Sequence, residues 1–473
     1  MRLGELRGAG RTPALPLTLD LEGEPLELVQ WLRVLPGQRY VAKALWRGRT
    51  VLAKLFVGTK AERNLVGEMD GAQWLLQQGL LTPDPLEHGF VPGEGGWLLF
   101  AYIEDAQSLG EAWLSVERDP PLSEGQEEIL GESLRVIAAL HAKGLWQSDL
   151  HLDNLLKTDS QLWLIDAGGI RAARVGEPLD RTRALQNLGV FFAQLPPTLD
   201  PHLDELLVHY LLVNGNHALS VERLLEEVAS ARRWRLKDFV SKLGRDCTLF
   251  SVQRNVRELR AVCRDQVHLL DALLNRPDTS IKEGRSLKQG GSATVVLVEH
   301  AGRSLVVKRY NLKSFAHWLR RCWRPTRAWH SWVQGHRLNF VGIATPRPLA
   351  VLERRRLWLR DRSYLITEYL DAPDIVAAFA PYVDGGLPDE MLRAICLLFA
   401  GLIRERISHG DMKGTNLIWR SGQVWLIDLD AVQHHADTRS FNPAFAKDRS
   451  RFLRNWPEAS ALNRLLDKQL PRL

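Results

Sequence analysis

The stretch HGDMKGTNLIWRSGQVWLIDLDA, residues 409–431, decides the fold of this chain. In this stretch Asp411 is followed five residues later by Asn416 and, after a hydrophobic run, by Asp428. A carboxylate, an amide and a second carboxylate in this order are the set that phosphoryl transfer requires. The first carboxylate orients and deprotonates an acceptor hydroxyl. The amide oxygen and the second carboxylate hold Mg²⁺ on the phosphates of a nucleotide.

The same constellation occurs once more, in SDLHLDNLLKTDSQLWLIDAGG, residues 148–169. Asp149, Asn154 and Asp166 have the same separations as their counterparts in the second half, and the hydrophobic lead-in LWLID resembles VWLID. Matching residue types at matching spacing are hard to obtain by chance. The sequence therefore predicts an α+β protein with two tandem bilobal protein-kinase-like domains, each with a small antiparallel β-rich lobe and a larger helical lobe.

A glycine turn and a lysine, with the same separation between them in both copies, precede each constellation. A kinase small lobe holds the nucleotide phosphates through one lysine and through backbone N–H groups of such a turn. Lys54 follows Gly37 by the same number of residues as Lys308 follows Gly291. The residues predicted to bind ATP are Gly37 and Lys54 in the first copy, and Gly290, Gly291, Ser292 and Lys308 in the second.

The helix after the lysine usually supplies a glutamate that pairs with it. In the first copy Glu68 is the candidate, and Glu62 on the same predicted helix is the alternative. At the equivalent position of the second copy stands Ser331, and no Asp or Glu occurs from Lys308 through Gly342. Either another acceptor holds Lys308, or the second domain binds its nucleotide in a different manner. The first copy has its own deficit, a single glycine in the phosphate turn.

The two predicted catalytic loops differ in one cation. Asp411 and Asp149 are the predicted catalytic bases, and Lys413 can neutralise charge on the transferring phosphoryl group. In the first copy His151 replaces this lysine, and its charge at pH 7 is only partial. The predicted metal ligands are Asn154, Asp166, Asn416 and Asp428. The acidic residues that adjoin them are expected to be structural hydrogen-bonding groups: Asp153 and Asp430.

The pattern along the chain predicts a domain division. Residues 1–23 are rich in Gly and Pro without periodicity, and we expect a loose leader there. Residues 24–275 are assigned to the N-terminal kinase-like domain and residues 276–473 to the C-terminal one. The helical patterns between residues 180 and 275 are expected to complete the larger lobe of the first domain.

Composition limits the class of protein. The chain has 473 residues, of which 45% are hydrophobic and 25% are charged, as in soluble globular proteins of several domains. No apolar run approaches the roughly eighteen residues that a membrane span needs. The start of the sequence lacks an export pattern, and four scattered cysteines fit a reducing cytoplasm. The formal charge of +6 suits an anionic partner, but only weakly.

Several stretches of the second half resemble the lipopolysaccharide core heptose kinases, the WaaP/InaA-like group. The stretches that carry the resemblance are GGSATVVLVEHAG (290–302), RRCWRPTRAWHSW (320–332), GIATPRPLA (342–350), ISHGDMKGTNLIW (407–419) and VWLIDLDAV (424–432). The first half looks like a more divergent member through SDLHLDNLL and LWLIDAGG.

The resemblance implies a protein-kinase-like fold, ATP with Mg²⁺, and a sugar hydroxyl as acceptor, with heptose of the lipid-linked core oligosaccharide as the expected sugar. It also implies work at the cytoplasmic face of the inner membrane. By this similarity Asp411 is the base, while Asn416 and Asp428 bind the metal. Neither half shows an activation segment that ends in Ala-Pro-Glu, which disfavours a protein as the acceptor.

Two other functions stay open. One domain could be a nucleotide-binding scaffold that regulates the other, or the chain could be a protein kinase. The basic, Trp-rich stretch from Trp318 to Trp332 is either a solvated helical face with core tryptophans or a patch for acceptor and membrane. Basic side chains near an anionic surface support reversible, peripheral association. Nucleic acid is not expected, because no nucleic-acid-binding motif accompanies the charge.

Overall fold

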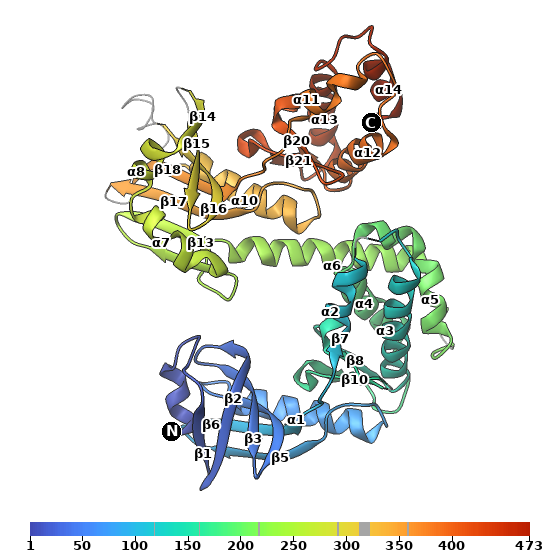
Figure 1. Cartoon of the computed structure of the whole chain (residues 1–473). Helices are drawn as coiled ribbons and strands as arrows, with labels where there is room; N and C mark the ends of the chain where they lie inside the picture. The colour runs from blue at the N-terminus through green and yellow to red at the C-terminus, as the bar shows by residue number, and fades with distance from the viewer. Residues whose placement is uncertain (118, 160, 216–217, 291–292, 312–321, 357–358) are drawn as a thin grey trace. The chain divides into compact units, whose positions relative to one another are not determined.

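The computed structural model describes residues 1–473 except 118, 160, 216–217, 291–292, 312–321 and 357–358. The chain folds into two compact units, Met1–Trp234 and Arg235–Leu473 (Figure 1). Each unit combines antiparallel sheet with packed helices, and the predicted mixture of helix and strand is confirmed.

The first unit begins with a six-stranded antiparallel sheet of order β1-β2-β3-β4-β6-β5, against which helix α1 packs. The turn between β3 and β4 has positive φ at Arg47 (49°) and Gly48 (73°), which is the conformation of a two-residue hairpin turn that matches strand twist. The elements are β1 (Leu17–Leu21), β2 (Glu24–Leu35), β3 (Arg39–Trp46), β4 (Arg49–Phe56), α1 (Ala61–Gln77), β5 (Pro85–Val91) and β6 (Gly95–Ala101).

The rest of the first unit is mainly helical. Helix α3 buries Leu130, Leu134 and Ile137 on one face, at the spacing of an amphipathic helix. The helices are α2 (Leu109–Val116), α3 (Glu124–Ala142), α4 (Arg181–Phe192), α5 (Leu203–Leu211) and α6 (Val221–Lys242), whose last residues belong to the second unit. Short strands connect them: β7 (Gln107–Ser108), β8 (Leu145–Gln147), β9 (Leu155–Lys157), β10 (Leu162–Leu164) and β11 (Ile170–Ala172).

The second unit has a seven-stranded antiparallel sheet of order β12-β13-β17-β18-β16-β15-β14. Its strands are β12 (Phe250–Arg254), β13 (Glu258–Cys263), β14 (Arg285–Gln289), β15 (Ala293–His300), β16 (Arg303–Tyr310), β17 (Pro348–Arg356) and β18 (Leu359–Glu368). The helices of this lobe are α7 (Val267–Asn275), α8 (Pro277–Glu283) and α10 (Arg327–Phe340).

A helical lobe completes the second unit around an aromatic core. Phe399, Phe445, Phe452 and Trp456 are buried there and contact one another edge to face. The helices are α11 (Ile375–Phe379), α12 (Asp389–Arg404), α13 (Thr438–Leu453) and α14 (Ala461–Gln469). The short strands are β19 (Ile407–Ser408), β20 (Leu417–Arg420), β21 (Gln423–Leu426) and β22 (Gln433–His434).

Five strands of each sheet follow one order: β2-β3-β4-β6-β5 in the first unit and β14-β15-β16-β18-β17 in the second. The two predicted ATP-binding lysines occupy the third strand of each series. Lys54 on β4 lies opposite Leu98 of β6, and Lys308 on β16 lies opposite Leu365 of β18. The lysine therefore sits at the same place in both sheets.

The expected loose leader over residues 1–23 is corrected by the structure. This segment forms a 3-10 helix, Leu3–Gly8, and strand β1, and it buries Leu6 and Leu19 completely. The Tyr40 hydroxyl donates to the carbonyl oxygen of Leu6 at 2.6 Å. The alternation in LTLDL is too short to stand out beside the Gly and Pro residues, although it is enough for an edge strand.

The expected break near residue 275 is corrected as well, because the two compact units meet at Trp234 and Arg235. Strands β12 and β13 and helix α7 belong to the second unit, where Val262 of β13 pairs with Ala350 of β17. Residues 254–263 were expected to be helical, but Glu258–Cys263 form strand β13, in which Leu259 and Ala261 are buried on either side of the half-buried Arg260. The partner strand lies far along the sequence, so no local pattern reveals the pairing.

Replacement of Leu6 by Ala tests whether the N-terminal segment is part of the fold. Loss of this buried side chain should lower the free energy of unfolding by about 2–5 kcal/mol. Leu212→Ala is the matched control, since this leucine is 73% exposed and should change stability by less than about 0.5 kcal/mol. Urea unfolding followed by tryptophan fluorescence measures both. Equal midpoints for Leu6→Ala and the native chain would show that the segment is a loose leader after all.

Candidate functional site

In the first unit, the structure brings the predicted lysine, helix acid and metal-binding acid together. The Lys54 ammonium forms a buried ion pair with Glu68 of α1 and lies 3.5 Å from Asp166. Glu62, the alternative helix acid, is exposed in the first turn of α1. Glu68 is therefore the acid that faces the lysine.

The Asp166 carboxylate is held in its charged form. Burial alone would raise its pKa, but the positive charges of Lys54, Arg39 and Arg33 outweigh burial and hold the pKa below its usual value. The Arg39 guanidinium lies 3.6 Å from the same carboxylate oxygen that faces Lys54. An ionised carboxylate in this place is a suitable ligand for a hard divalent cation.

A main-chain bond places each predicted amide ligand beside its acid. The Ile165 N–H donates to the carbonyl oxygen of Asn154 at 2.8 Å, and the Ile427 N–H donates to that of Asn416 at 2.9 Å. In both cases the next residue is the aspartate predicted to bind the metal. The side-chain NH₂ of each asparagine donates to the carbonyl oxygen of the catalytic-loop aspartate five residues earlier, at 2.8 Å and 2.9 Å. The amide oxygen is thus the ligand atom that the side chain offers.

Asn and Asp oxygens fit Mg²⁺, which takes a few protein oxygens and completes its shell with phosphate and water. The first pair is Asn154 with Asp166, and the second is Asn416 with Asp428. Both aspartates adopt left-handed backbone conformations, with φ of 64° and 60°. The described part of the chain shows no larger group of His, Cys, Asp or Glu arranged for a metal.

In the second unit, no helix glutamate among the described residues faces Lys308, and its two acidic partners both come from the segment after β21. Its ammonium lies 2.6 Å from Asp428 and 2.9 Å from Asp430. Burial alone would raise the pKa of Asp428, but the charge of Lys308 and its hydrogen bond lower the pKa below the usual value. Asp430 was expected to be only a structural hydrogen-bonding group, yet it faces the lysine directly.

Side chains of α13 contact the predicted catalytic loop of the second unit and hold it in place. The Asp448 carboxylate accepts hydrogen bonds from the N–H groups of His409 (2.6 Å) and Gly410 (2.9 Å). One turn further along the helix, the Arg451 guanidinium lies 2.6 Å from the Asp411 carboxylate. Lys413 lies 3.4 Å from Asp411.

Sequence reasoning missed Asp448 and Arg451. They lie in TRSFNPAFAKDRSRFL, which carries no catalytic motif, and only their spacing of three residues on one helix would have indicated a shared face. Burial raises the pKa of the Asp448 carboxyl, although its two backbone N–H donors favour the charged form. Burial also lowers the pKa of His409, so this imidazole is neutral at pH 7.

The catalytic loop of the first unit is built differently. Asn187 of α4 donates to the carbonyl oxygen of Gln147 at 2.7 Å, whereas in the second unit Asp448 accepts from N–H groups of the loop. His151 lies 3.6 Å from Asp153. The Asp149 side chain is exposed, and within the described ranges no ion pair reaches it. This loop therefore lacks the two cations that flank Asp411.

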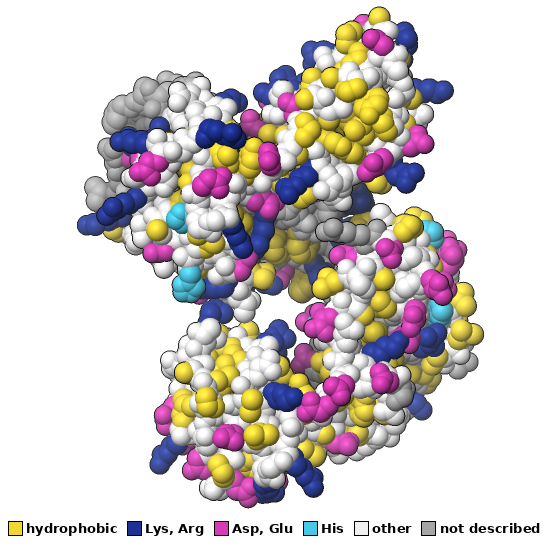
Figure 2. Space-filling view, in the orientation of Figure 1, with side chains coloured by type: hydrophobic (Ala, Val, Ile, Leu, Met, Phe, Trp, Pro, Cys, Tyr) yellow, Lys and Arg dark blue, Asp and Glu magenta, His cyan; other side chains and the backbone are white. Residues whose placement is uncertain are grey.

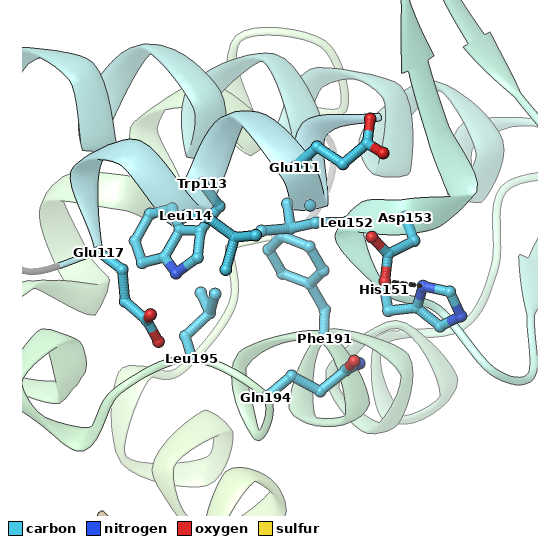
Figure 3. Close-up of a pocket in the computed structure, with 11 residues that line it drawn as sticks. Glu111, Trp113, Leu114, Glu117, His151, Leu152, Asp153, Phe191, Gln194 and Leu195 are labelled. Carbon is cyan, nitrogen blue, oxygen red and sulfur yellow. Dashed lines mark ion pairs between the residues drawn. The ribbon is translucent and has the colours of Figure 1, made fainter. Parts of the chain in front are cut away.

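A pocket of about 360 Å³ lies beside this first catalytic loop (Figure 3). Polar groups of Glu111, His151 and Gln194 line it together with the apolar side chains of Leu114 and Phe191. Figure 3 shows that α2, the catalytic loop and α4 supply these walls. Its size is that of a site for a small organic ligand.

The predicted phosphate turns are only partly described. Gly37 lies in the turn between β2 and β3, with φ of 68°. Gly290 directly follows strand β14, and its N–H donates to the carbonyl oxygen of Ala293 at the start of β15. Gly291 and Ser292 lie outside the described residues.

Asp448→Ala should loosen the second catalytic loop. The buried N–H of His409 and the partly buried N–H of Gly410 would lose their acceptor, at a cost of about 1–3 kcal/mol. We expect faster amide exchange of peptides that contain His409 and Gly410, measured by hydrogen–deuterium exchange and mass spectrometry. The exposed Asp384→Ala is the control and should leave these peptides unchanged. Unaltered exchange in Asp448→Ala would mean that α13 does not hold the loop.

Comparison with known proteins finds a family match in the second half. Residues 271–461 match the model of the lipopolysaccharide kinase (Kdo/WaaP) family. Among solved structures, WaaP in complex with acyl carrier protein is similar to the chain, with a TM-score of 0.33, 14% identity, and coverage of 44% of this chain and 86% of that chain. No curated protein is significantly similar to the chain. Within the described ranges, no helix has the length and apolar character to cross a membrane.

Proposed function

We propose that the second unit, which matches the model of the lipopolysaccharide kinase (Kdo/WaaP) family over residues 271–461, is a kinase that transfers the γ-phosphoryl group of ATP to a heptose hydroxyl of the lipid-linked core oligosaccharide. The observation that carries this proposal is the ion pair between Lys308 and Asp428. Asn416 links Asp428 to Asp411, because its side chain donates to Asp411 and its carbonyl oxygen accepts from Ile427, the residue before Asp428. The finer points, ATP as donor and heptose as acceptor, rest on the resemblance of the sequence to the heptose kinases.

Each side chain then has one chemical task. The Asp411 carboxylate accepts the proton of the sugar hydroxyl while the new O–P bond forms and the bond to the β-phosphate oxygen breaks. Lys413 offsets negative charge on the transferring group. Asn416 and Asp428 would hold Mg²⁺, which when bound neutralises charge on the nucleotide phosphates. Lys308 orients the same phosphates.

Arg451 helps to fix the orientation of this base. Its guanidinium fixes one oxygen of Asp411, while Asn416 donates to the other at 3.1 Å. A carboxylate held on both oxygens keeps one orientation toward the acceptor, which is the positional requirement of general-base catalysis. The Arg451 side chain is 46% exposed, so the charge is screened in part by water.

For the first unit, the geometry favours nucleotide binding without efficient transfer. Its lysine has the complete partnership with Glu68 and Asp166, but Asp149 is exposed and has His151 where the second unit has Lys413. The interpretation of one domain as a nucleotide-binding scaffold for the other is therefore applied to the first unit. Both units would share the protein-kinase-like fold, as their common strand order suggests.

We propose peripheral contact with the cytoplasmic face of the inner membrane. Residues 318–321 of the basic, Trp-rich stretch lie outside the described residues, but Trp323 and Arg324 are exposed in front of α10. Indole and guanidinium groups are suited to a membrane–water interface. Trp332 is completely buried and serves the core instead. On the face shown in Figure 2, basic side chains alternate with acidic ones over both units, which suits transient rather than permanent attachment.

Separate Asp411→Asn and Asp149→Asn variants test this division of labour. Asp411→Asn removes the base and should lower transfer by about 10²–10⁴-fold. Asp149→Asn should leave most of the transfer intact. The measurement is the phosphate content of core oligosaccharide, by mass spectrometry, in cells that carry each variant in place of the native chain.

Exposed Asp384→Asn is the control and should match the native chain. Full phosphate content with Asp411→Asn would contradict the proposal. Loss with Asp149→Asn alone would move transfer to the first unit. Phosphate on protein with none on sugar would favour a protein kinase.

A further inference from the structure

Asp430 lies at the centre of a hydrogen-bonded cluster in the second unit. One oxygen of its carboxylate accepts from Lys308 at 2.9 Å, from the Tyr310 hydroxyl at 2.6 Å and from the Ser331 hydroxyl at 2.9 Å. The Arg327 guanidinium is 3.8 Å from the other oxygen. A carboxylate with this many donors is fixed in place, and so is the ammonium that it faces.

The two units hold exchanged residues at two equivalent positions. Glu68 of α1 and Ser331 of α10 stand at equal distances before the glycine that closes each helix. Two residues after the metal-binding aspartate, the first unit has Gly168 and the second has Asp430. The first unit thus has its acid on the helix and a glycine in the segment after the predicted metal ligand, whereas the second unit has a serine on the helix and its acid in that segment.

A steric reason explains why both acids do not occur together. A Cβ placed on Gly168 would collide with the carboxylate of Glu68, which is itself buried. In the first unit the Glu68 carboxylate thus fills the space that a side chain at position 168 would enter. In the second unit the helix side chain is the small Ser331, and the Asp430 carboxylate reaches that hydroxyl and the lysine at once.

We propose that Asp430 is the positioning residue of Lys308, in the role that Glu68 has for Lys54. This inference rests on the proposed nucleotide site of the second unit and answers which acceptor replaces the missing helix acid. In the first unit the acid that positions the lysine lies on the helix, whereas in the second unit it lies in the segment that bears the proposed metal ligand Asp428. Orientation of Lys308 is thereby tied to the metal-binding segment, while α10 contributes the Ser331 hydroxyl and the Arg327 guanidinium.

The test is a residue exchange within the full chain. Asp430→Gly removes the acceptor, and Ser331→Glu combined with Asp430→Gly reproduces the arrangement of the first unit. All variants carry Lys54→Met, which silences the first nucleotide site. Asp384→Gly is the matched control, because it makes the same change at an exposed position.

The first readout is the rate at which an amine-reactive acylating reagent labels Lys308, followed by peptide mass spectrometry. It requires neither nucleotide nor acceptor. Loss of Asp430 should expose the amine and raise labelling severalfold, and the double variant should restore the native rate. The second readout is affinity for Mg·ATP, which should fall by about tenfold to a hundredfold in Asp430→Gly and recover in the double variant.

Native labelling of Lys308 in Asp430→Gly would overturn the inference. So would a folded double variant, checked by circular dichroism, in which neither labelling nor affinity recovers, because a purely structural Asp430 is not replaced by an acid on another element. The proposed function fails separately. If the native chain protects Lys308 and binds Mg·ATP but transfers no phosphate to core oligosaccharide, the positioning role stands and the substrate assignment does not.

Discussion

The ion pair between a strand lysine, buried in the first unit and mostly buried in the second, and the predicted metal-binding aspartate is the interaction on which both units depend. Lys54 and Lys308 come from the third strand of a common five-strand series, and Asp166 and Asp428 come from left-handed residues at the end of a short hairpin. A buried ammonium is costly unless carboxylates face it. The ion pair therefore fixes the sheet, the helix behind it and the metal-binding segment relative to one another within each unit.

The two halves meet this constraint with different second acids. A helix glutamate makes the orientation of the lysine depend on the place of the helix, whereas an aspartate two residues from the metal ligand makes it depend on the metal-binding segment. The predicted catalytic loops also differ, in the number of cations beside the predicted base. Cations surround Asp411, while Asp149 lies open to solvent. The nucleotide end of the first unit and the catalytic end of the second unit are thus the more complete, which suits a division between binding and transfer.

Much of the site was predictable because it is encoded by spacing. The lysines were found by their register with a glycine, and Glu68 was preferred over Glu62 by its distance from the end of the helix. Neither step needs long-range contacts. Asp448 and Arg451 were missed because they act on the catalytic loop from a helix that carries no motif. Asp430 was noticed but given a structural role, since sequence alone does not show that its carboxylate reaches the strand lysine.

The sequence by itself determined the repeated catalytic constellation, the α+β class, and the absence of a helix acid in the second half, since these depend on residue identity and spacing along the chain. Tertiary structure decided where the units divide, that the first residues are part of a sheet, and which carboxylate meets Lys308. Each of these depends on partners distant in sequence: β13 pairs with β17, and Lys308 meets Asp430. Burial and strand pairing bring such residues together, and no local pattern records it.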